Sequence, residues 1–171
     1  MPRPPLDSEA LERLALFYAG RYATTRAKLR SYLTRKVRER GWEGGGQVPI
    51  ESLVERFTEL GYVNDRAFAT AKGASLQRKG FGERRLDQAL YAAGIESGDA
   101  VEAKESAQAG AFDAALRFAQ RKRIGPYATS EPDRAVRARA FAAMIRAGHS
   151  TDLARKMVNS RAGEIPEPDE I

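Results

Sequence analysis

The side chains of this chain that could do chemistry are mainly cations, and they lie in three groups. The chain of 171 residues has 29 Lys and Arg against 23 Asp and Glu, which gives a formal net charge of +6. Between Arg21 and Arg40, eight Lys or Arg residues accompany one acid, Glu39, so this stretch alone carries +7. Further groups occur at 78–85 and 117–123. Such clusters can hold phosphates or an acidic protein surface, whereas solubility explains any single residue equally well.

Several aromatic residues lie near these cations and could stack on nucleobases. They are Tyr22, Tyr32, Phe81 and Tyr127. Packing in the core or between helices is the commoner role for such rings, so the cations are the stronger signal.

Residues for catalysis or metal binding are sparse. The chain has no Cys and a single His, His149. It contains no Walker-type phosphate loop and no nucleophile elbow. Glu51, Glu55 and Glu59 recur every four residues, as on a solvated helix face, and no other residues complete a metal site with them. We therefore expect no enzyme, no catalytic residue, no metal and no cofactor.

The elements that must position the cations are helices. Apolar residues recur at three- and four-residue spacing, and capping residues and glycines mark the ends. Helices are predicted over 7–20, 25–40, 49–61, 64–80, 82–94, 97–107, 112–123, 133–147 and 150–158, and no strand is needed. Asp7 or Ser8 caps the first, the second begins after Thr24 or Thr25, and Asn64 or Asp65 caps the fourth. In the second of these, Lys28, Arg35 and Arg38 lie opposite the apolar residues and should face solvent or a partner.

One pattern repeats around Gly41, Gly94 and Gly148, which are 53 and 54 residues apart. An apolar residue stands four and eight positions before each glycine. A ring or branched residue follows each glycine directly: Trp42, Ile95 and His149. This position makes packing the expected role of His149. Because one short module cannot bury its apolar face alone, the near-constant spacing predicts an array of helical modules.

The predicted fold is all-α, with about three tandem three-helix modules. The predicted divisions are a mobile N-terminal arm at 1–6, modules at 7–63, 64–108 and 109–161, and an acidic disordered tail at 162–171. No stretch approaches the ~20 apolar residues of a membrane span, and the first residues do not resemble a secretory signal. The absence of Cys fits a reducing compartment. We expect a cytoplasmic protein without a membrane partner.

Three segments of the chain resemble the RecX family of regulators of the RecA recombinase. The strongest is RKGFG at 78–82, followed by RRL at 84–86 and AGI at 93–95. LGYVNDRAFA at 60–69 and the stretch 139–158, with RAGHS at 146–150, are also similar to the family. The resemblance covers roughly residues 11–158. The chain departs from the usual pattern at Asn64, Glu83, Asp87 and Ala89, and by a small insertion at 44–46.

The resemblance implies a non-enzymatic protein of tandem three-helix modules in an elongated, curved array. Such a protein lies along the groove of RecA filaments on DNA and modulates, usually inhibits, recombinase, ATPase and SOS co-protease activity in DNA repair. The implied partners are the RecA filament and single-stranded DNA, contacted directly or through the filament, and the protein is expected to be a monomer.

The cations at the module junctions are the candidate contact face for RecA or DNA. They are Lys28, Arg35, Arg38, Arg78, Lys79, Arg84, Arg85, Arg121, Lys122 and Arg123. A basic body of several modules could bridge neighbouring subunits of a filament. Two alternatives stay open: a helical protein that binds DNA directly without RecA, and a helical-repeat scaffold with an unrelated partner.

Overall fold

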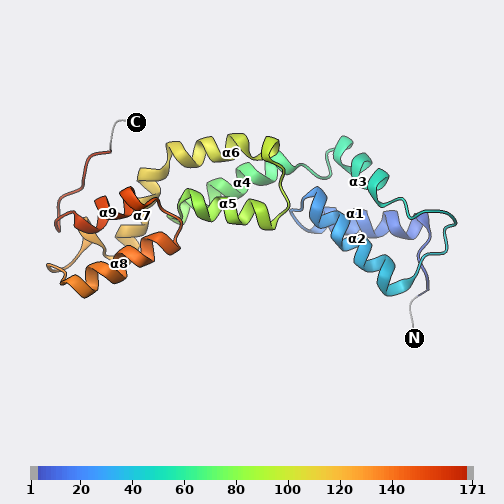
Figure 1. The fold of residues 1–171 in the computed structure, drawn as a ribbon. Coiled ribbons are helices and arrows are strands. Elements are labelled where there is room, and N and C mark those ends of the chain that lie inside the picture. The colour runs from blue at the N-terminus through green and yellow to red at the C-terminus, as the bar shows by residue number, and fades with distance from the viewer. Residues whose placement is uncertain (1–3, 169–171) are drawn as a thin grey trace. The chain divides into compact units, whose positions relative to one another are not determined.

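The computed structural model describes residues 4–168, and this part of the chain is built from α-helices (Figure 1). In chain order they are α1 Ser8–Arg21, α2 Arg26–Arg40, α3 Ile50–Glu59, α4 Asp65–Arg78, α5 Glu83–Ala92, α6 Ser97–Ala109, α7 Ala111–Lys122, α8 Arg134–Arg146 and α9 Thr151–Asn159. A short 3₁₀ turn, η1 Gly125–Tyr127, follows α7. The β-type pairing within residues 4–168 is one isolated bridge between Leu6 and Trp42. The all-α prediction is confirmed.

Short polar side chains cap the helices where the sequence predicts their starts. Asp7, Thr25, Asp133 and Ser150 each accept a hydrogen bond from the backbone N–H three residues later. Asn64 does the same for the N–H of Ala67 at the start of α4. Each cap satisfies a backbone donor that the helix itself cannot, which typically stabilises a protein by about 1 kcal/mol. The predicted starts of these helices are confirmed.

The chain divides into two compact units. The first consists of residues up to Ala69 together with Tyr91–Asp99, and the second of Thr70–Leu90 together with the residues from Ala100 onward. Helices α4, α5 and α6 each contribute to both units. Each unit has a large hydrophobic cluster. That of the first unit lies, apart from Leu6, in the first predicted module, and the buried residues of the other lie in the third. The division into three modules stays a prediction.

The core of the first unit is formed by the inward faces of α1, α2 and α3. Leu11, Leu29, Leu33 and Phe57 are buried there. Leu6 is also fully buried: its N–H donates to the carbonyl of Gly41 at 2.9 Å, and its carbonyl accepts from the N–H of Glu43 at 2.9 Å. The structure differs here from the predicted mobile arm, whose residues 1–3 lie outside the described residues. Leu60, which follows the last turn of α3, is exposed.

The core of the second unit joins α7, α8 and α9. Phe118, Met144, Ala154 and Met157 are buried in it. Beyond α9, residues 162–168 of the predicted acidic tail form no helix, and the N–H of Gly163 donates to the carbonyl of Pro126 at 2.8 Å. Residues 169–171 of that predicted tail lie outside the described residues.

His149 packs inside the second unit, as the sequence predicts. Its ring is almost fully buried and meets Phe118 edge to face, with centroids 5.6 Å apart. Its Nε2 donates to the carbonyl of Gly80 at 3.0 Å. Burial lowers the pKa of His149 to about 4, against the opposing effect of this hydrogen bond. The imidazole is therefore neutral at pH 7.

Two of the segments used for the family resemblance contact each other through their backbones in this unit. The N–H of Gly82 donates to the carbonyl of Ala147 at 2.9 Å, and the N–H of Arg84 donates to the carbonyl of Gly148 at 3.1 Å. A Cβ on Gly148 would lie 2.5 Å from the backbone nitrogen of Arg85, so this close approach requires glycine. The glycine turns are thus sites of tight packing between helices.

In the part of the chain that the structure describes, no helix combines the length and the apolar character needed to cross a membrane.

Candidate binding surfaces

The ten candidate cations fall into both units. Lys28, Arg35 and Arg38 belong to the first unit and the other seven to the second. Nine of the ten are exposed, and Lys28 is half-buried. Arg35 pairs with Glu39, whereas the other nine form no ion pair with any residue between 4 and 168. Their charge is therefore available to a partner.

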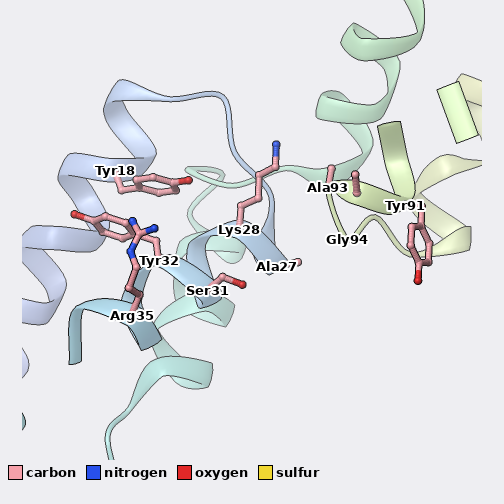
Figure 2. A pocket seen from close by; sticks show the side chains of 10 residues that line it. Tyr18, Ala27, Lys28, Ser31, Tyr32, Arg35, Tyr91, Ala93 and Gly94 are labelled. Carbon is pink, nitrogen blue, oxygen red and sulfur yellow. The ribbon is translucent and has the colours of Figure 1, made fainter. Parts of the chain in front are cut away.

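In the first unit, Lys28 and Arg35 border a groove built on stacked tyrosines, which we call the aromatic groove. Tyr18 of α1 and Tyr32 of α2 stack with their ring centroids 4.2 Å apart (Figure 2). Tyr22 tilts against Tyr18 with centroids 5.3 Å apart. Two cavities of about 440 and 630 Å³ adjoin here, and Tyr18, Lys28, Tyr32 and Arg35 line both of them. Their shared lining makes them one continuous groove.

The cations of the aromatic groove are placed on rings. The Nζ of Lys28 lies 4.9 Å from the centre of the Phe68 ring, and Arg35 and Lys36 lie 5.7 and 5.8 Å from the centre of Tyr32. Lys36 also binds Glu39 at 2.7 Å, a hydrogen bond that lowers the pKa of this carboxyl. A groove with rings and cations side by side can stack a nucleobase and bind its phosphate. Arg38 does not line either cavity.

The far wall of the groove is the segment 91–94, which a hydrogen bond from Thr25, the cap of α2, holds in place. The hydroxyl of Thr25 donates to the carbonyl of Ala93 at 2.6 Å. A Cβ on Gly94, whose φ is 69°, would lie 2.3 Å from the Cβ of Ala27, so only glycine allows this approach. Tyr91 stands on this wall with 88% of its surface exposed.

A cluster of ionic side chains at the start of α2 supports the same wall; we call it the Arg26 cluster (Arg26, Asp65, Glu96 and Asp99). Asp65, of which 4% is exposed, accepts from the backbone N–H of Arg26 at 2.9 Å and from its Nε at 3.2 Å. The Nη2 of Arg26 donates to Asp99 at 2.6 Å. Asp65 is thus a buried carboxylate that is fully partnered, and it ties α4 and the 96–99 segment to α2.

In the second unit, Phe81 lies between two guanidinium groups. The Cζ atoms of Arg85 and Arg121 are each 5.6 Å from the centre of its ring. Arg121 also donates to the carbonyl of Lys79, and Arg117 donates to the carbonyl of Gln77 at 3.3 Å. These arginines hold the turn between α4 and α5, so part of this group supports the fold. Phe81 and Tyr127 pack against the hydrophobic cluster, which is the commoner of the two roles considered for them.

The remaining candidates of the second unit do not form one group with Phe81. Lys122 and Arg123 line a separate cavity at the end of α7. Arg78, Lys79 and Arg84 are exposed near the α4–α5 turn. The structure thus resolves the predicted face into a groove, a turn and a cavity.

Sequence reasoning missed several members of the aromatic groove. Tyr18, Lys36 and Tyr91 are not among the predicted site residues, and Asp65 is predicted only as a possible helix cap. The spacing of Tyr18 and Tyr22, four residues apart on one helix face and next to the basic stretch, was the signal that could have identified the groove. No group of His, Asp and Glu side chains in residues 4–168 could hold a metal ion.

Comparisons with known proteins place the chain in a family. No family model matches it. Two relatives are named regulatory protein RecX: that of Myxococcus xanthus (strain DK1622) is 36% identical over 160 residues, covering 88% of this chain and 84% of the relative. That of Agrobacterium fabrum (strain C58) is 30% identical over 148 residues, covering 84% and 79%.

A solved structure shares the fold. The crystal structure of RecX from Lactobacillus salivarius matches with a TM-score of 0.70, over 88% of this chain and 93% of that one, at 15% sequence identity. At this identity the match concerns the fold alone. The sequence relationship with two proteins of known name covers most of the chain and confirms the resemblance found in the glycine turns. This protein therefore belongs to the RecX family.

Proposed function

We propose that this protein is a regulator, most often an inhibitor, of a RecA recombinase, and that it binds along the RecA–DNA filament. Its relatives are named regulatory proteins, and this is the single observation that carries the proposal. The exposed cations without ionic partners support it, because a RecA–DNA filament presents phosphates and acidic side chains. In this proposal the protein acts in the cytoplasm as a non-enzymatic monomer and reduces recombination, ATP hydrolysis and SOS co-protease activity.

The distribution of the cations suggests how one molecule could inhibit several RecA subunits. Basic groups lie on both units of the chain, so binding through one unit raises the effective concentration of the other near the filament. A bridged pair of subunits would resist the rearrangements that accompany ATP turnover. Inhibition should therefore occur well below one molecule per RecA subunit.

A second candidate function is direct binding of single-stranded DNA, and the aromatic groove favours it. Stacking on a protein ring contributes roughly 1–3 kcal/mol per base without sequence preference. Tyr32 with Lys28 and Arg35 offers a ring and two cations within one groove. This activity could operate without RecA or as part of filament binding.

DNA-dependent ATP hydrolysis by RecA from the same source tests the proposal. The protein is titrated at substoichiometric ratios, beside a variant with Lys28, Arg35 and Arg38 changed to Glu. We expect the wild type to inhibit and the variant to inhibit at least tenfold less while keeping its helical circular-dichroism spectrum. Unchanged hydrolysis, together with binding of the wild type to bare DNA at the same salt, would contradict RecA regulation and favour the second function.

A further inference from the structure

We propose that a cavity in the second unit binds an acidic peptide segment of a protein partner and takes one apolar side chain of that segment as an anchor. The cavity has a volume of about 580 Å³. It is formed by the end of α7, the loop at 128–133, α8 and Val158 of α9; α7, α8 and α9 are neighbours in this unit (Figure 1). We call it the α7–α8 pocket. The ten-residue contact face includes only two of the residues that line it.

The floor of the α7–α8 pocket is aliphatic. Ile124 and Val158 form its buried part, with Ala140 and Ala143 beside them. Val136 also lines it and is 40% exposed, so an apolar surface is open to solvent here. A cavity of this size, with an apolar floor and a few polar groups at its edge, suits one or two side chains of a peptide.

The rim of the pocket is cationic. Lys122, Arg123 and Arg139 line it and form no ion pair with any residue in 4–168. The acids at the rim are already engaged, since Glu131 pairs with Arg137 and Asp133 accepts from the N–H of Val136 at 2.8 Å as the cap of α8. Asp133 keeps one negative charge against the three unpaired cations, so the net charge of the rim is positive and complements an acidic segment.

Arg123 holds a backbone conformation that glycine would hold with less strain. Its φ of 54° and ψ of 50° make it the one non-glycine residue with a left-handed backbone among the described residues. Elsewhere in the described chain a positive φ near a helix end falls to glycine, as at Gly41, Gly94 and Gly148. A non-glycine residue at a strained position marks a site where the side chain can have a function, and Arg123 lies on the rim of the α7–α8 pocket.

A peptide suits this pocket better than a nucleic acid. Its lining among the described residues has no aromatic ring, whereas stacking on bases requires one. The hydroxyls of Thr129 and Ser130 lie on the loop side and can bind a peptide backbone. If the protein regulates RecA as proposed above, the segment belongs to a RecA subunit; this identification rests on that proposal, but the chemistry of the pocket does not.

Methyl NMR of the full chain tests the pocket directly. The probe is a synthetic peptide, acetyl-DDELFEDD-amide, added to protein labelled at the methyl groups of Ile, Val and Ala. We expect saturable shifts at Val136, Ala140 and Ile124. Two control peptides, one with Leu and Phe replaced by Ser and one with all acids replaced by Asn or Gln, should bind at least tenfold more weakly.

Variants separate binding from folding. Arg123→Gly removes the guanidinium and relieves the left-handed strain, so we expect the peptide to bind at least fivefold more weakly while the melting temperature is unchanged or higher. Arg123→Asn, which also tolerates this conformation, should behave in the same way. Arg146→Ala, at an exposed cation outside the pocket lining, is the matched control and should bind the peptide normally.

Three outcomes would overturn the proposal. They are an absence of shifts at these methyls at millimolar peptide, full affinity in Arg123→Gly, and larger shifts at the same methyls with a single-stranded oligonucleotide than with the peptide. A failure of the RecA proposal looks different: hydrolysis by RecA would be insensitive to the protein while the peptide still shifted Val136. Conversely, if the protein inhibited RecA but the peptide caused no such shifts, the proposed regulation would stand and the proposed peptide pocket would be wrong.

Discussion

The aromatic groove and the α7–α8 pocket carry cations of the same kind beside very different neighbours. In the groove, Lys28 and Arg35 lie on the rings of Phe68 and Tyr32. In the pocket, Lys122 and Arg123 stand beside aliphatic side chains and an open loop. The cations attract an acidic partner but do not select it. The surface beside them, aromatic in the groove and aliphatic in the pocket, distinguishes a base from a peptide side chain.

The two regions also differ in how they are held. Hydrogen bonds and the Arg26 cluster fix the wall of the aromatic groove, and the cations rest on rings. In the second unit, buried His149 belongs to the core, and Arg123 at the pocket has a strained backbone. The groove should therefore depend on ion pairs and the second unit on pH.

The largest expected effect is that of removing Asp65, which should disturb the aromatic groove but not the α7–α8 pocket. Asp65→Ala leaves Arg26 without its buried partner, which should lower the free energy of unfolding by about 3 kcal/mol. Binding of a single-stranded oligonucleotide should weaken, while the acetyl-DDELFEDD-amide shifts at Val136 stay unchanged. Urea denaturation and NMR measure both.

The control for this change is Asp87→Ala, since Asp87 pairs with Lys104 at an exposed site. The free energy of unfolding of that variant should fall by less than about 1 kcal/mol. Equal losses in the two variants would show that Asp65 contributes no more than a surface ion pair.

A second expected effect is that acid destabilises the second unit before the first. The pKa of His149 is lowered by burial to about 4 in the folded protein, against about 6.5 when unfolded. Between these values the unfolded chain binds a proton that the folded chain does not, so stability falls as the pH drops from 6.5 to 4, by about 3 kcal/mol at most. Hydrogen exchange of α7 and α9 at pH 4.5 and pH 7 measures it.

His149→Gln is the control for this pH effect, because its amide can donate to the carbonyl of Gly80 but does not titrate in this range. The variant should lose the part of the pH dependence between pH 6.5 and 4 that is specific to the second unit. If its exchange rates follow the wild type across that range, His149 is not the titrating group.

A smaller effect tests the stacking role of the groove. Tyr32→Leu keeps an apolar side chain but removes the ring, so affinity for an oligothymidylate should fall about tenfold, within the range for one stacked base. Tyr62→Leu, at an exposed ring outside the groove lining, is the matched change. Fluorescence anisotropy at fixed salt measures both, and equal losses would mean that the groove is not the stacking site.

The smallest effect concerns phosphate binding. Arg35→Ala should weaken oligonucleotide binding modestly and reduce the slope of log affinity against log salt by about 1. Arg123→Gly should leave this slope unchanged if the pocket takes peptide. A lower slope in both variants would indicate that DNA contacts both surfaces and would remove the distinction between them.

The helices could be predicted from sequence because their signals are local. Asp7, Thr25 and Ser150 each cap a backbone donor three residues away, and apolar spacing marks the buried face within a few turns. The fully buried position of Leu6 could not be predicted from the sequence, because it depends on backbone pairing with Gly41 and Glu43, which are distant in the chain.

The surfaces could be predicted only in part because their partners are distant in the chain. Tyr18 meets Tyr32 from another helix, and Asp65 meets Arg26 across 39 residues. The strained backbone of Arg123 could not be predicted from the sequence. The basic residues at 121–123 predict that the helix ends there, but not that an arginine takes the left-handed conformation. Charge density identified Lys28 and Arg35, but their neighbouring rings emerge only from the fold.

The most direct test of the proposed regulation measures the affinity of this protein, carrying a fluorescent label, for two partners at the same salt. One is a RecA filament on a single-stranded oligonucleotide, and the other is the bare oligonucleotide. We expect the protein to bind the filament at least tenfold more tightly than the bare oligonucleotide. We also expect that changing Lys28, Arg35 and Arg38 to Glu weakens binding to the filament. Equal affinity for the filament and for bare DNA would contradict regulation through RecA and leave a DNA-binding protein.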